Sequence, residues 1–355
     1  MIIEGSALEN GSSPELARQT MLYDRSRSYD WNFEHAPKPV AIGDVSEPTF
    51  AHRFLGMPCD SPLGIAAGPL LNSDWILYYA RLGYDILTYK TVRSRTRECY
   101  AMPNLLPVEC ESHLSPATLH ASETMRGSWA ISFGMPSKAP GVWMPDVQRA
   151  REKLPAGKLL TVSVVATPQP HWTLDQIADD YADVARRAVE SGADSIEANF
   201  SCPNVSSADG QLHQDASSAR VVAARIRQAI GDKPLALKIG AINDAEAAKR
   251  LLDATAGSIN GLSMINCIPA NVNFAEGQPA FGGESRGIGG TAIREAVLRQ
   301  VKLFQPLADE FQIEIIGVGG VSTRDDYRAL LDAGVSSVQV ATAAMLDPDL
   351  PSKLR

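Results

Sequence analysis

Eight short apolar runs, rich in β-branched residues, alternate with longer segments of helical period along most of the chain. The runs lie at residues 63–68, 85–92, 159–166, 195–201, 235–240, 261–266, 313–320 and 337–345. Strands that are apolar on both faces and are each followed by a helix are typical of a parallel sheet. Because eight such units close a barrel, the sequence predicts an α/β fold, a (β/α)8 TIM barrel over residues 56–355.

The segments between these runs carry helix signals. Thr173 precedes a stretch that has apolar residues at helical spacing and ends in a glycine. This is the pattern of a capped helix, and residues 243–257 and 322–335 repeat it. We therefore expect helices in these three segments.

Two parts of the chain do not show this alternation of apolar runs and helical segments. Residues 1–55 are polar and without a steady period, so we expect an N-terminal arm that packs on the barrel. Residues 93–158 follow the second strand and contain many prolines, and so long a segment within a compact domain is usually functional. We expect an insertion over the C-terminal mouth of the barrel. Its short basic cluster of Arg93, Arg95 and Arg97 is interpreted as a solvated loop in preference to an anion site.

Composition excludes several classes of protein. The net charge of −8 argues against a nucleic-acid partner, which would require a positive surface. The five cysteines form no CxxC pair, which argues against a metal site, and their odd number suggests reduced thiols in a cytoplasmic protein. The N-terminus lacks a secretory pattern and no apolar run could cross a bilayer, so we expect no integral membrane segment.

Polar side chains stand at the carboxyl ends of several predicted strands. The carboxyl ends of barrel strands meet at one mouth, so these side chains should lie close together. Lys90 and Lys238 stand in runs as apolar as "ILTYKTV" and "LALKIG", and a buried ammonium group needs a partner or a ligand. The other residues at these strand ends are Asn199, Cys202, Asn266 and Cys267.

Glycine pairs stand beside helix starts in "SRGIGGTAI" (285–293) and "GVGGVSTRDD" (317–326). Backbone N–H groups at such places bind phosphate, and glycine lets the phosphate approach. The common phosphate site of the barrel follows strands seven and eight, where the second pair lies. Lysines and asparagines suit the carbonyl and imide edges of a flat heterocycle, so the set suggests flavin mononucleotide (FMN) with a second polar ring stacked on it.

Six motifs of this chain are "EANFSCPNV", "LTYKTV", "LALKIG", "RGIGG", "GVGGV" and "VATAAM". On these motifs the chain resembles the dihydroorotate dehydrogenase family over roughly residues 55–348. The family has an FMN-containing α/β barrel. The resemblance therefore implies oxidation of dihydroorotate to orotate, a reaction of pyrimidine biosynthesis.

The resemblance implies that Cys202 is the catalytic base. The soluble branch of the family has a cysteine in the loop after the fourth strand, where the membrane-associated branch has a serine, and "SCPN" is intact here. Oxidation of a saturated ring bond requires the loss of a hydride, which FMN N5 accepts, and of a proton alpha to a carbonyl, which a thiolate accepts. Without the resemblance, a small buried cysteine with no catalytic role would explain Cys202 equally well.

The other roles also follow from the resemblance. Lys90 is expected near both flavin and substrate as a second catalytic residue, and Lys238 at the pyrimidine edge of the flavin, where it would stabilise the anionic reduced form. The substrate-binding residues would be Lys90, Asn199, Asn204, Asn266 and Cys267. The cofactor-binding residues would be Ala66, Ala67, Gly68, Lys90, Asn199, Lys238, Gly289, Gly290, Gly319, Gly320, Ala341 and Thr342.

Two departures from the family pattern concern the substrate. Where the family has a pattern like "NSMGLPN", this chain reads "ISFGMPS" (131–137), so Ile131 replaces an asparagine; Cys267 stands where a serine or threonine is usual. An unpaired imide edge would cost on the order of 1–3 kcal/mol. Either another group within 95–140 compensates, or the substrate is not dihydroorotate.

Four hypotheses follow. The intact "NFSCPN" and Asn266 favour dihydroorotate oxidation, whereas Ile131 and Cys267 favour a related FMN oxidoreductase or reductase of another dihydropyrimidine, cyclic amide or unsaturated carbonyl. A Schiff-base aldolase that uses Lys238 leaves Cys202 and the asparagines without a purpose, and a binding barrel without turnover is the fourth. The sequence does not identify the electron acceptor, and the resemblance to the soluble branch suggests a homodimer.

Overall fold

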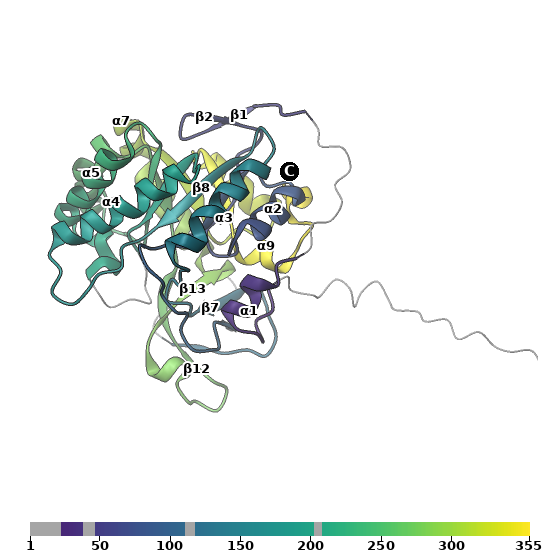
Figure 1. The fold of residues 1–355 in the computed structure, drawn as a ribbon. Coiled ribbons are helices and arrows are strands. Elements are labelled where there is room, and N and C mark those ends of the chain that lie inside the picture. Colours follow the sequence, from purple (N-terminus) through teal and green to yellow (C-terminus); the bar gives the residue numbers. More distant parts are fainter. Residues whose placement is uncertain (1–22, 38–46, 111–117, 202–207) are drawn as a thin grey trace, which may run out of the picture.

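The computed structural model of the protein describes residues 23–37, 47–110, 118–201 and 208–355. Its centre is a closed barrel in which every neighbouring pair of strands is parallel, and β15 pairs with β3 to close it (Figure 1). The prediction of a (β/α)8 TIM barrel is therefore confirmed, with all eight strands at the predicted runs. The strands are β3 (Leu63–Ile65), β4 (Ile86–Val92), β8 (Leu159–Val164), β9 (Ser195–Asn199), β10 (Leu235–Ile239), β11 (Gly261–Met264), β14 (Glu314–Val318) and β15 (Ser337–Val340).

Helices surround the barrel. Thr173 and Thr323 each cap a helix through a reciprocal capping box, and Asp244 caps a third, so the three predicted helices are confirmed. The helices are α2 (Ser73–Leu82), α3 (Pro140–Lys153), α4 (Leu174–Glu190), α5 (Ala216–Ile230), α6 (Ala245–Thr255), α7 (Arg294–Phe311), α8 (Arg324–Asp332), α9 (Thr342–Leu346) and α10 (Leu350–Leu354). Short 3-10 turns are η2 (Ala208–Gln214), η3 (Ala256–Ser258), η4 (Ala280–Gly283) and η5 (Thr291–Ile293).

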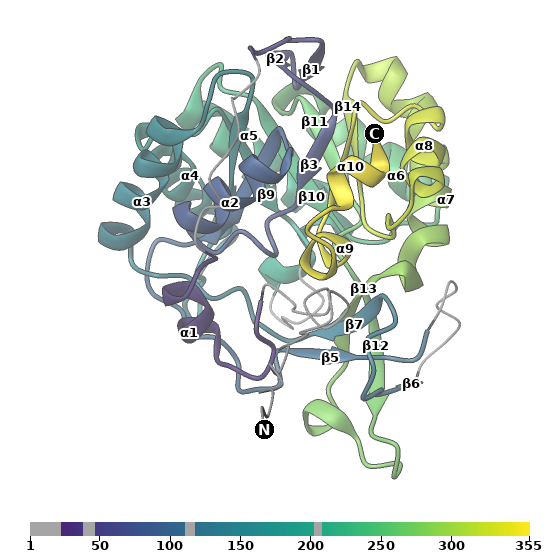
Figure 2. The same ribbon diagram turned by 90° about the vertical axis from the view of Figure 1, so that its right-hand side faces the viewer.

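A second sheet lies across one end of the barrel (Figure 2). It combines strands from the segment after β4 with two strands that follow β11, so parts far apart in the sequence meet there. Its strands, in spatial order, are β5 (Leu105–Pro107), β7 (Ser128–Ile131), β13 (Arg286–Gly290), β12 (Ile268–Asn273) and β6 (Thr118–His120).

The end of the proline-rich segment 93–158 is not irregular. Pro140–Lys153 form α3, which packs beside α2 and α4 in the outer ring of helices. Pro140 stands in the first helical turn, where its missing amide hydrogen has no helical partner to lose. Pro145 lies farther inside, so proline content alone was a poor guide to loop structure here.

The described part of the N-terminal arm packs on the barrel. Its helix α1 (Tyr29–Glu34) is held by two hydrogen bonds, from Asn72 Nδ2 to the Phe33 carbonyl (2.6 Å) and from Trp75 Nε1 to the Asn32 carbonyl (3.0 Å). The hairpin of β1 (His52–Phe54) and β2 (Met57–Cys59) lies at the opposite end of the barrel from the second sheet (Figure 2). Among the described residues, no helix is long and apolar enough to cross a membrane.

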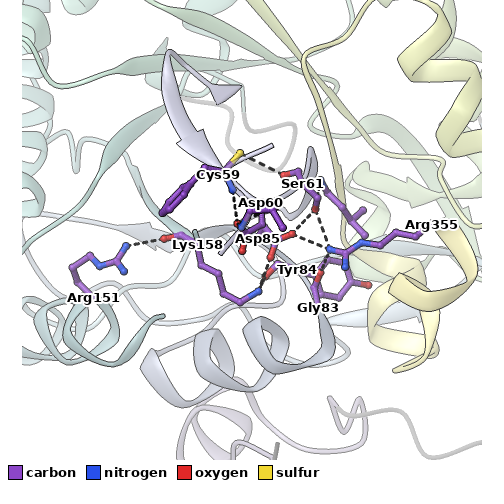
Figure 3. Close-up of polar contacts among 12 residues, drawn as sticks. Cys59, Asp60, Ser61, Gly83, Tyr84, Asp85, Arg151, Lys158 and Arg355 are labelled. Carbon is purple, nitrogen blue, oxygen red and sulfur yellow. Dashed lines mark hydrogen bonds and ion pairs between the residues drawn. The ribbon is translucent and has the colours of Figure 1, made fainter. Parts of the chain in front are cut away.

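A polar cluster closes the amino-terminal end of the barrel (Figure 3). The carboxylate of Asp85, which directly precedes β4, accepts hydrogen bonds from Lys158 Nζ (2.5 Å), Arg355 (2.9 Å) and the Ser61 hydroxyl. The Asp85 side chain is only 5% exposed. The cluster joins the start of three strands to the last described helix, and this end of a TIM barrel ordinarily serves stability rather than chemistry.

Candidate functional site

A cavity lies at the C-terminal mouth of the barrel, between the strand ends and the second sheet. Residues of the segment after β4, among them Trp129 and Phe133, form part of its wall, so this part of the expected insertion does lie over the mouth. Every predicted site residue that the structure describes lines this cavity. They are Ala66, Ala67, Gly68, Lys90, Asn199, Lys238, Asn266, Cys267, Gly289, Gly290, Gly319, Gly320, Ala341 and Thr342.

Two predicted site residues, Cys202 and Asn204, lie outside the described residues. The chain leading to them is described as far as Ser201, which is buried beside the cavity-lining asparagines. It is described again from residue 208, where η2 begins. The role of Cys202 therefore stays a prediction.

Lys90 is held at the mouth by a carbonyl group and two aromatic rings. Its Nζ donates to the Gly68 carbonyl (3.0 Å) and lies 4.5 Å from the ring centroid of Phe133 and 5.7 Å from that of Tyr29. Ring faces attract ammonium groups through their quadrupoles. Because Tyr29 belongs to α1 and Phe133 to the segment after β7, both the arm and the insertion position this lysine.

The side-chain amides of Asn199 and Asn266 are linked. Asn266 Nδ2 donates to Asn199 Oδ1 (3.3 Å) and to the Ser201 carbonyl, and the Ser201 amide donates to Asn199 Oδ1 (3.2 Å). Asn199 Nδ2 donates in turn to the thioether sulfur of Met135 (3.4 Å). These bonds fix the orientation of both amides in the cavity wall, and among the described residues no donor occupies Asn266 Oδ1.

Lys238 forms a buried ion pair with a residue that was not predicted. Its Nζ lies 3.9 Å from Glu197 Oε2, and the two side chains are 6% and 3% exposed. Both residues line the cavity. Glu197 stands two positions before Asn199 on β9, and the period of two in a strand places both side chains on the same face. That alternation was the signal in the sequence that could have identified Glu197.

Three of the four glycines in the two pairs have backbone conformations that favour glycine. Gly319 and Gly320 have φ values of +101° and +78°, and Gly290 has +93°. A Cβ on Gly320 would lie 2.4 Å from the Cα of Arg294, at the start of α7. The backbone at 319–320 can therefore pass between α7 and the cavity only without a side chain. Packing of this turn against the start of α7 therefore requires the glycines, and their backbone is part of the cavity wall.

One wall of the cavity is apolar where the family pattern has an asparagine. Ile131, at the end of β7, lines the cavity together with Met135. A Cβ on Gly289 would lie 3.0 Å from Ile131 Cδ1 and 3.9 Å from Cys267 Sγ, so these side chains lie close together. The departures at positions 131 and 267 therefore affect one region of the cavity.

The interpretation of Arg93 as part of a solvated loop was wrong. The residue is fully buried, and its guanidinium donates to the Met135 carbonyl (2.9 Å) and to the carbonyl of Ala166. A guanidinium group can be buried when its N–H groups find carbonyl acceptors. Arg93 thereby fixes Met135, whose φ of +53° is unusual for a residue with a side chain, against the end of β4. Arg95 is different, because its guanidinium lies over the ring of Trp172.

The cavity fits a flavin nucleotide by two structural tests. A Cβ on Gly68 would have no atom within 4 Å, so the cavity has open space above this turn. The donor groups suit the ligand, since ammonium and amide groups at one side match polar ring edges and the glycine turns match a phosphate. The described residues contain no group of three His, Cys, Asp or Glu side chains arranged to hold a metal ion.

Comparisons with known proteins agree with this geometry. A family model described as dihydroorotate dehydrogenase matches residues 50–355. A dihydroorotate dehydrogenase from Dictyostelium discoideum is 30% identical over 357 residues, which cover 94% of this chain and 96% of that protein. The catalytic subunit of dihydroorotate dehydrogenase B (NAD(+)) from Exiguobacterium sibiricum is 29% identical, with 61% of this chain and 70% of that protein covered. The protein of the same name from Fusobacterium nucleatum is 31% identical over 50% of this chain and 57% of its own length.

Proposed function

Because the chain belongs to the dihydroorotate dehydrogenase family, whose members are oxidoreductases acting on CH–CH bonds, we propose that it binds FMN and oxidises dihydroorotate to orotate. The observation that carries this proposal is the single cavity that gathers Lys90, Asn199, Lys238 and Asn266 beside the glycine turns. No other arrangement in the described residues combines buried cations, amide groups and phosphate-type turns at the mouth of the barrel.

The residues that would hold FMN divide into two groups. The glycine turns at 289–290 and 319–320, with Ala341 and Thr342, would bind the phosphate and ribityl chain through backbone N–H groups. Lys238, Lys90 and Asn199 would bind the polar ring edges. When bound, FMN supplies a hydride acceptor at N5.

The protein's own part in the reaction is to hold the substrate and remove a proton. Asn199 and Asn266 provide amide donors and acceptors in fixed orientations for the cyclic amide, and Lys90 provides a positive charge for an anionic group. Cys202, as a thiolate, would take the proton from the ring carbon alpha to the carbonyl. In the sequence it directly follows Ser201 and comes three residues after Asn199, the last residue of β9.

The test is an anaerobic half-reaction. Purified protein should show the yellow absorption spectrum of a flavin. Addition of dihydroorotate without oxygen should bleach the visible flavin band rapidly. A yellow protein that dihydroorotate does not bleach would refute the proposed substrate. A colourless protein that takes up no added FMN would refute the cofactor as well, and would favour the aldolase or binding hypotheses.

The role of Cys202 has a separate test. Cys202→Ala should retain FMN and lose bleaching near neutral pH, because no group would accept the proton. Cys202→Ser should recover activity mainly at high pH, since a hydroxyl is a much weaker acid than a thiol. Full bleaching by Cys202→Ala would exclude the thiol as the base.

A second candidate function rests on the apolar wall at Ile131. If the substrate is another dihydropyrimidine or cyclic amide with an apolar edge at this wall, dihydroorotate should bleach the flavin slowly and the alternative substrate quickly. Ile131→Asn would then improve dihydroorotate oxidation, because it restores an amide near Gly289 and Cys267. If wild-type protein already bleaches rapidly with dihydroorotate, Ile131 is a tolerated variation.

A further inference from the structure

Glu197 is a buried carboxylate for which the proposed reaction has no use. It lies on β9 inside the barrel, with its side chain 3% exposed and facing the cavity that Lys238 also lines. Among the described residues it accepts no hydrogen bond, and Lys238 is its one charged partner. A charge buried in this way is costly unless it serves a partner or a ligand.

The pair is close enough for strong electrostatic interaction but not for a hydrogen bond. The distance of 3.9 Å between Lys238 Nζ and Glu197 Oε2 exceeds the usual range for an N–H···O bond. The Lys238 ammonium is therefore attracted toward Glu197, and among the described residues it donates no hydrogen bond, so its N–H groups can serve a ligand in the cavity. Charges this close in a buried site act on each other far more strongly than in water.

The side chains beside the pair are uncharged. In the strand register, Ser163 of β8 lies opposite Glu197, and its hydroxyl is bonded to that of Thr91 (3.0 Å). Ser263 of β11 lies opposite Lys238. With hydroxyl groups on both sides, the pair contributes one positive and one negative charge to the field in the cavity, and these partly cancel; Lys90 adds a second positive charge in the cavity wall.

We propose that Glu197 is a positioning residue that acts through Lys238: it holds the ammonium group at the cavity wall and offsets its charge. This inference rests on the proposed function, because it concerns the cofactor that Lys238 would bind. A fully uncompensated lysine would stabilise the reduced, anionic flavin strongly and so hinder the transfer of electrons onward. Glu197 limits that stabilisation, and the pair together sets the reduction potential of the bound cofactor.

The experiment measures FMN binding rather than turnover. Apoprotein of wild type, Glu197→Gln and Glu190→Gln is titrated with oxidised and with reduced FMN, and the midpoint potential of each holoprotein is determined. Glu190 is an exposed residue on α4, so Glu190→Gln removes the same charge far from the cavity and should match wild type. Glu197→Gln should favour reduced over oxidised FMN by about tenfold more than wild type, which is a rise of about 30 mV for a two-electron couple.

Further variants separate the proposed role from a general structural one. Lys238→Met should lower the potential, and in that background Glu197→Gln should have a much smaller effect, because a buried carboxylate that has lost its cation is neutralised and has little charge left to remove. Glu197→Asp keeps the charge and should lie between wild type and Glu197→Gln. If Glu197→Gln does not fold, the potentials of Glu197→Asp and Lys238→Met still provide the test.

The outcomes are distinguishable from failure of the proposed function. Wild-type protein that binds no FMN would refute the cofactor assignment itself. Wild-type protein that binds FMN, with Glu197→Gln at an unchanged or lowered potential, would overturn only the role of Glu197. An equal shift for Glu197→Gln with and without Lys238 would overturn the claim that Glu197 acts through the lysine.

Discussion

Asp85→Asn should lower the free energy of unfolding by about 3 kcal/mol, because it removes the carboxylate that Lys158, Arg355 and Ser61 share at the amino-terminal end of the barrel. Asp85 is 5% exposed and contacts Lys158 Nζ at 2.5 Å and Arg355 at 2.9 Å (Figure 3). An asparagine has nearly the same shape, so the change removes charge without opening a cavity.

The magnitude follows from the exposure of the two partners. Lys158 is 14% exposed, so without Asp85 it becomes a largely buried charge whose remaining acceptor among the described residues is the Tyr84 carbonyl (3.0 Å). Breaking a buried pair on one side costs about 3–5 kcal/mol. Arg355 is 45% exposed, so solvent screens its ion pair with Asp85. Loss of this pair therefore contributes at most about 1 kcal/mol to the fall in unfolding free energy. The remaining bond of Lys158 places the total near the lower end of the range.

The assay is urea unfolding at equal FMN saturation, because a bound ligand adds its own stability. The midpoint should fall while the slope stays unchanged. Asp253→Asn, which breaks the exposed Lys249–Asp253 pair on α6, is the matched control and should leave the midpoint unchanged. A loss below about 1 kcal/mol for Asp85→Asn would refute the reasoning, since it would mean that solvent screens Asp85 as it screens a surface pair.

Three further predictions follow from other parts of the molecule. Burial lowers the pKa of His213 below its usual 6.5, so as pH falls through about 6.5 the unfolded chain takes up a proton that the folded chain does not. Stability should therefore decrease on acidification, measured by unfolding at several pH values, and His213→Gln should flatten that slope; an identical slope in the variant would contradict this cause. Gly320→Ala should lose FMN in a binding titration, because its Cβ would collide with the backbone of Arg294 at a φ of +78°; normal FMN affinity would show that the turn can adjust. Thr173→Ala should cost about 1 kcal/mol of unfolding free energy through the lost cap of α4, whereas Thr173→Ser should retain most of it.

The sequence by itself determined the barrel and most of the residues at its mouth. Apolar runs such as "LLTVSV" are buried along their whole length in β8, and such runs have few alternatives to a parallel sheet covered by helices. Once the strands are known, the geometry of parallel strands brings their carboxyl ends together. The sequence therefore places Lys90, Asn199, Lys238 and Asn266 at one mouth of the barrel, where all four line the cavity.

Only the tertiary structure decided which charged groups are buried and what they contact. Arg93 belongs to a basic cluster in the sequence, and its burial depends on carbonyls of Met135 and Ala166 that approach from distant parts of the chain. Glu197 has a charged partner only because the neighbouring strand β10 places Lys238 Nζ 3.9 Å from its carboxylate. In the second sheet β7 pairs with β13, although four strands of the barrel, β8 to β11, lie between them in the sequence. Local patterns report the periodicity of one element, whereas burial and charge pairing depend on contacts between elements, and these exist only when the chain has folded.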